Sequence, residues 1–74
     1  MKDLDILAQN LMIEQKQAEI DGFISCPITY TELCELLLKN IDFVAKMGGN
    51  DYANIIDDMY CCGSLEKAIT NYTK

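Results

Sequence analysis

The chain has 74 residues, half of them apolar, and it contains neither histidine nor arginine. Histidine is the usual residue for proton transfer and metal ligation near neutral pH. Arginine is the residue that most often binds phosphate and carboxylate groups. Without either, the chain is poorly suited to most catalysis and to nucleic-acid binding. Six lysines against twelve aspartates and glutamates give a net charge of −6, which repels nucleic acids and anionic membranes and suits a basic partner.

Length and hydropathy predict one folded domain, residues 1–74, with a modest core. No apolar run reaches the length of a membrane span, and polar residues interrupt the apolar positions near the N-terminus, unlike a secretory signal. We therefore expect a cytoplasmic protein without membrane contact.

The first predicted helix covers residues 3–21 and ends at Gly22. One of its faces has apolar residues at helical spacing: Leu4, Leu7, Ala8, Leu11 and Ala18. A second stripe, Ile6, Ile13 and Ile20, repeats every seven residues on a different face. Two interpretations stay open for this stripe: it packs within the domain, or it meets another chain and forms a homodimer.

The second predicted helix covers residues 30–47 and follows a loop at 22–28. Thr29 and Glu32 have the spacing of a capping box at its start. Apolar residues cover most of its circumference, so we expect it to be the central helix. We expect Gly48-Gly49 to end it through a positive φ.

The remaining helices are predicted over residues 51–62 and 64–73. Asn50 or Asp51 is expected to cap the first of them, and Ser64 the second. If Gly63 breaks the chain, these are separate helices. The prediction is therefore an all-α, compact bundle of three to four helices, without strands.

The segment from Ala45 to Ile55 resembles a helix-turn-helix motif, with Ala45, Gly49 and Ile55 at matching intervals. The resemblance implies either a DNA-reading element or only a tight corner between helices. The helix in the recognition position carries aspartates and no basic residue, so we do not expect direct nucleic-acid binding.

The four cysteines, Cys26, Cys34, Cys61 and Cys62, lack the spacing of zinc ligands. We expect free thiols that serve as small core residues; the alternative is a disulfide between Cys26 or Cys34 and the Cys61-Cys62 pair. A redox or metal-responsive role for Cys61 and Cys62 is the least favoured functional hypothesis.

Catalytic patterns are missing from the sequence. Asp57 and Asp58 are adjacent, so on a helix they lie about 100° apart and do not converge on one atom. No nucleophile has a histidine base, and no calcium loop or phosphate-binding glycine loop is present. We expect no enzyme activity, no cofactor and no metal.

The favoured hypothesis is a small acidic helical protein that binds a basic protein. In its length and its use of lysine alone as the basic residue, the chain is similar to accessory proteins of phages and mobile elements from AT-rich bacteria. That similarity implies an inhibitor of a nucleic-acid-handling host protein, of the anti-CRISPR or DNA-mimic type. The alternatives are a homo-oligomeric structural module and an acidic charge that serves only solubility. The candidate acidic contacts are Asp42, Asp51, Asp57, Asp58 and Glu66.

Tyrosines supply the candidate aromatic contacts, because tyrosine is enriched at protein interfaces. Tyr30 and Tyr60 are predicted contact residues, in addition to the stripe of Ile6, Ile13 and Ile20. Tyr52 and Tyr72 are expected at the edge of the core.

Overall fold

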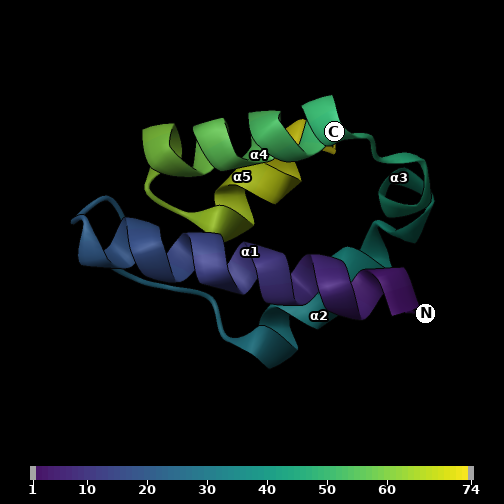
Figure 1. Ribbon diagram of the computed structural model, residues 1–74, viewed down its shortest axis with the longest axis horizontal. Helices are drawn as coiled ribbons and strands as arrows, with labels where there is room; N and C mark the ends of the chain where they lie inside the picture. The colour runs from purple at the N-terminus through teal and green to yellow at the C-terminus, as the bar shows by residue number, and fades with distance from the viewer. Residues whose placement is uncertain (1, 74) are drawn as a thin grey trace.

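The computed structural model describes residues 2–73, which form five helices (Figure 1). These are α1 (Lys2–Ile20), α2 (Tyr30–Lys39), α3 (Ile41–Lys46), α4 (Gly49–Cys62) and α5 (Leu65–Tyr72). Within this range no strand occurs, so the predicted all-α bundle is confirmed, with five helices instead of three or four.

The longest helix, α1, runs almost the full length of the molecule. At 1.5 Å per residue its 19 residues span about 28 Å, close to the 31 Å length of the molecule. It packs on α2 and on α4, and α5 packs on α4 (Figure 1). The expectation that residues 30–47 form the central helix is wrong, because Leu38 of α2 is 55% exposed and α3 buries no side chain.

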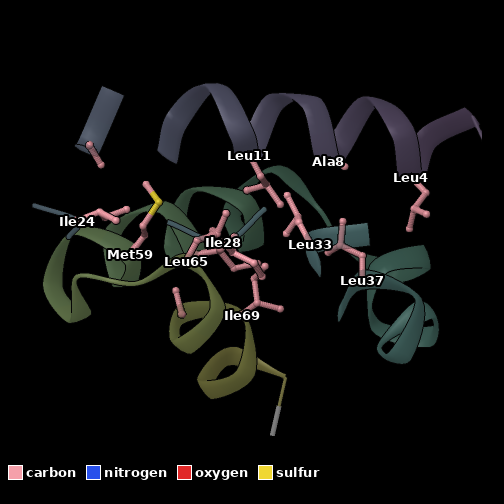
Figure 2. Close-up of a cluster of buried hydrophobic side chains, with 13 residues drawn as sticks. Leu4, Ala8, Leu11, Ile24, Ile28, Leu33, Leu37, Met59, Leu65 and Ile69 are labelled. Atoms are coloured by element: carbon pink, nitrogen blue, oxygen red, sulfur yellow. The ribbon is translucent and has the colours of Figure 1, made fainter. Parts of the chain in front are cut away.

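The core lies between α1 and the other helices (Figure 2). From α1, the side chains of Leu4 and Leu11 point towards Leu33 and Leu37 of α2 and towards α4 and α5. The buried apolar residues are Leu4, Ala8, Leu11, Ala18, Ile24, Ile28, Leu33, Leu37, Ile55, Met59, Leu65, Ala68 and Ile69. The apolar faces predicted for the first and last helices are thus the faces that form the core.

Several predicted helix ends are confirmed. The Glu32 amide donates to Thr29 Oγ1 (3.2 Å), and the Thr29 amide donates to Glu32 Oε1 (3.1 Å), which makes the capping box reciprocal. Gly63 takes a left-handed conformation (φ 73°) after α4, and Ser64 caps α5. The two C-terminal helices are therefore separate.

The predicted helix at 30–47 is broken at Asn40, between α2 and α3. The Asn40 side chain donates to the Leu36 carbonyl (2.9 Å), while its backbone amide bonds to Leu37 instead of continuing the α-helical pattern. Asparagine side chains compete with the backbone in this way and favour turns over helix interiors.

The start of α4 also differs from expectation. Gly48 is extended (φ −105°) and Gly49 is the first helical residue, so neither glycine uses a positive φ. Asp51 lies in the first turn, and its carboxylate accepts the Gly48 amide proton (3.0 Å). The expectation that Asn50 or Asp51 is the N-cap residue is wrong: Gly48 is the N-cap, and Asp51, the third helical residue, accepts a hydrogen bond from its amide.

Candidate functional site

The isoleucine strip, Ile6, Ile13 and Ile20, lies on the outer face of α1. Their side chains are 56%, 67% and 66% exposed. At 100° per residue, Ile13 lies roughly 180° from the centre of the buried face formed by Leu4, Leu11 and Gln15. The interpretation that these isoleucines pack within the domain is therefore wrong, because the isoleucine strip faces away from the core.

A surface hollow adjoins the N-terminal end of the isoleucine strip. Its volume is about 310 Å³, and it is lined by Ile6, Leu7 and Asn10 of α1 and by Tyr52 of α4. Partial burial, followed by the charge of Glu14, raises the pKa of the Tyr52 hydroxyl above its ordinary value. Tyr52 is half-buried at the edge of the core, as predicted, and it also forms one wall of this hollow.

An aromatic pair borders the opposite end of the strip. The rings of Phe23 and Tyr60 meet edge to face, with centroids 4.9 Å apart. Tyr60 is half-buried, whereas Phe23 is 52% exposed. The sequence interpretation missed Phe23; its position three residues after Ile20 was the available signal.

The other predicted aromatic contact, Tyr30, is exposed at the start of α2. The neighbouring Cys34 side chain raises the pKa of the Tyr30 hydroxyl above its ordinary value. Tyr72 is half-buried and holds α5 to its neighbours: its ring meets Phe43 edge to face, and its hydroxyl donates to Asp51 Oδ1 (2.8 Å).

The predicted acidic contacts are distributed over several places. The Asp51 carboxylate is engaged within the fold, because it accepts hydrogen bonds from the Gly48 amide and the Tyr72 hydroxyl. These bonds lower the pKa of its carboxyl group. Asp58 lies on the same side of α4 as Asp51, whereas the exposed Asp57 points about 100° away. Asp42 is exposed on α3.

The fifth acidic candidate, Glu66, is brought together with two glutamates that the sequence interpretation did not name as partner contacts. A hollow of about 190 Å³ between α2 and α5 is lined by Glu66, Glu32, Glu35 and Lys39, with Ile28 and Leu36 as its apolar lining. The hydrogen bond from the Thr29 backbone amide lowers the pKa of the Glu32 carboxyl group.

The helix-turn-helix resemblance does not correspond to a packed corner. Ala45 is exposed, and a Cβ placed on Gly49 would meet nothing within 4 Å. Neither residue therefore serves a close approach of helices, and only Ile55 is buried as the motif requires.

All four cysteine thiols are free, and Cys26, Cys61 and Cys62 are exposed while Cys34 is half-buried. The prediction that the cysteines serve as small core residues is wrong for the three exposed ones. Among the described residues, no three acidic or cysteine side chains are placed to hold a metal ion.

Within residues 2–73, no helix combines the length and the apolar character needed to cross a bilayer. The chain matches no protein family model, no curated protein and no solved structure.

Proposed function

We propose that this chain acts by binding another protein, with the isoleucine strip on α1 as its contact surface. The observation that carries the proposal is the exposure of three isoleucines in register on the face opposite the core. Single exposed apolar residues are common on proteins, but three large ones repeated on one face of a helix favour an interaction surface. No catalytic role is part of this proposal.

The surroundings of the strip support this role. The hollow beside Ile6 and the aromatic pair beside Ile20 extend the apolar surface at both ends of α1. Tyrosine and phenylalanine supply large rigid contact area at low entropic cost, which is why aromatic residues are frequent in interfaces. The helix itself is held by its buried face, so little ordering is needed on binding.

The test compares two variants that make the same chemical change on different helices. Ile13→Glu places a charge in the middle of the strip. Leu38→Glu alters a comparably exposed residue (55%) on α2 and serves as the control. A tagged chain should lose its bound proteins from native extract with Ile13→Glu and keep them with Leu38→Glu. Equal binding by wild type and Ile13→Glu contradicts the proposal.

A second candidate function is the inhibition of a basic nucleic-acid-handling protein, as in phage or mobile-element inhibitors of the anti-CRISPR or DNA-mimic type. It is favoured by the net charge of −6 and by the three glutamates around the hollow between α2 and α5. Carboxylates on such a surface would take the places of phosphates on a basic groove.

The charge hypothesis predicts salt-sensitive binding that depends on where the charge lies. Glu35→Gln combined with Glu66→Gln removes two charges from the hollow, whereas Asp57→Asn combined with Asp58→Asn removes two from α4. The pair whose loss weakens partner binding and reduces its salt dependence marks the contact surface. If neither double variant changes affinity or salt dependence, the charge hypothesis is wrong.

A further inference from the structure

The isoleucine strip is flanked on its own helix mainly by uncharged side chains, although the chain as a whole is strongly acidic. On the helical wheel of α1, the described side chains within about 60° of Ile13 are Ile6, Gln9, Asn10, Lys16, Gln17 and Ile20. The described carboxylates of this helix, Asp5, Glu14 and Glu19, lie about 80–120° from Ile13. Glu19 forms an ion pair with Lys16 (3.7 Å). A basic partner would be served by acidic flanks, whereas a second acidic chain needs a face without them.

The strip is also symmetric about its middle residue. Ile6 and Ile20 each lie seven residues from Ile13, which is about 10.5 Å along the axis on either side. Two α1 helices that cross at Ile13 in antiparallel orientation therefore place Ile6 of each copy opposite Ile20 of the other. This is the arrangement of a two-fold symmetric contact, in which one patch meets itself.

The flanking residues agree with the antiparallel orientation. Neighbours along one edge of such a pair are Asn10 and the second copy's Gln17, whose amide oxygen can accept from Asn10 while its Nε2 donates to Asp21 of its own chain (3.1 Å). Along the other edge, Lys16, which is ion-paired with Glu19 of its own chain, lies near the second copy's Gln9. These four positions therefore bring no like charges together. Antiparallel helices also oppose their dipoles, whereas a parallel pair aligns them.

The ends of the strip differ in shape, and the difference is complementary. Its N-terminal end carries the hollow beside Ile6 and Tyr52, and its C-terminal end carries the exposed side chains of Ile20 and Phe23. An antiparallel pair brings Ile20 and Phe23 of each copy towards the hollow of the other.

We propose that the isoleucine strip binds a second copy of this chain, so that the protein is an antiparallel homodimer with its two-fold axis at Ile13. This inference rests on the proposed function, because it names the partner of the same surface. A contact along one helix is at the small end of stable interfaces, so we expect a dissociation constant on the order of 100 µM or tighter.

The first experiment measures mass against protein concentration by sedimentation equilibrium from micromolar to millimolar, under reducing conditions that exclude disulfide dimers. Wild type should convert to a dimer that persists at high salt, because its contact is apolar. Ile13→Glu should weaken dimerisation at least ~10-fold by burying unpaired charges, and Leu38→Glu should change it less than ~2-fold. A wild-type monomer throughout, or a dimer that Ile13→Glu leaves unchanged, overturns the proposal.

The second experiment tests the orientation by mixing charged variants that are each weakened alone. Ile6→Glu mixed with Ile20→Lys should restore dimer formation, because the two positions meet in an antiparallel pair. Ile6→Glu mixed with Ile6→Lys should not. Restoration by the second mixture alone means a parallel pair and overturns the antiparallel arrangement.

The failure of this inference and that of the proposed function can be told apart. In one outcome the wild type is a monomer, Ile13→Glu loses the proteins bound from native extract, and Leu38→Glu keeps them. That outcome overturns the homodimer but supports the isoleucine strip as a protein-binding surface. A monomer whose bound proteins are unaffected by Ile13→Glu overturns both.

Discussion

Gln15 and Ile28 are joined by two buried hydrogen bonds across 13 residues of chain. Gln15 Nε2 donates to the Ile28 carbonyl (2.9 Å), and the Ile28 amide donates to Gln15 Oε1 (3.0 Å). Gln15 is the one buried polar side chain among the described residues, and it satisfies both backbone groups of a residue that lies outside any helix. The amide thus fixes the loop between α1 and α2 against α1, and it seats Ile28 in the core.

Replacing Gln15 by leucine should destabilise the fold by about 2–4 kcal/mol, because the amide and carbonyl of Ile28 would both be left buried without a partner. Urea unfolding followed by circular dichroism measures this loss. Gln9→Leu makes the same change at an exposed position of α1 and should stay within about 0.5 kcal/mol of wild type. Similar stabilities for the two variants would mean that the two hydrogen bonds contribute little.

The two left-handed glycines should respond differently to alanine. Gly22 (φ 87°) has open space where a Cβ would stand, so Gly22→Ala should cost only the backbone strain, about 1 kcal/mol. At Gly63 (φ 73°) a Cβ would lie 3.1 Å from the Phe23 carbonyl oxygen, so Gly63→Ala should cost more, about 2 kcal/mol or above. Thermal unfolding of the two variants side by side checks the order. A larger loss at Gly22 contradicts the assigned close approach.

The capping box at α2 makes a third prediction. Thr29→Ala removes the side-chain acceptor of the Glu32 amide and should cost about 1 kcal/mol in urea unfolding. Thr31→Ala, two residues further along the exposed surface, keeps the cap and should be nearly neutral. Equal losses would show that helix propensity, and not the cap, decides stability there.

Local signals in the sequence were sufficient to predict much of the fold. Helical spacing identified the buried faces of α1 and α5, and capping residues such as Thr29 and Ser64 marked helix starts. The break at Asn40 was not predicted, because a run of apolar residues continues through it and only its side-chain bond to Leu36 reveals the turn. The role of Gln15 also depends on a contact distant in sequence, which periodicity does not encode.

The candidate site was predictable to the extent that it lies on one helix. The seven-residue repeat of Ile6, Ile13 and Ile20 identified the strip, but whether another element covers it depends on the packing of α2 and α4. The Phe23–Tyr60 pair and the hollow at Tyr52 were missed because each arises where segments far apart in sequence meet.

The last prediction concerns how the stability of the fold declines at acid pH. Hydrogen bonds from the Gly48 amide and the Tyr72 hydroxyl hold the pKa of Asp51 below its ordinary value of 3.8. The ionised carboxylate therefore stabilises the fold at pH values above 3.8. This contribution disappears as the pH falls through the lower pKa of the folded state. Asp51→Asn should therefore lower stability near neutral pH and flatten its decline below roughly pH 4. Urea midpoints measured at a series of pH values test this. Asp57→Asn makes the same charge change at an exposed position of α4, leaves both hydrogen bonds of Asp51 in place, and serves as the control. Profiles that coincide for wild type and Asp51→Asn would contradict the assignment.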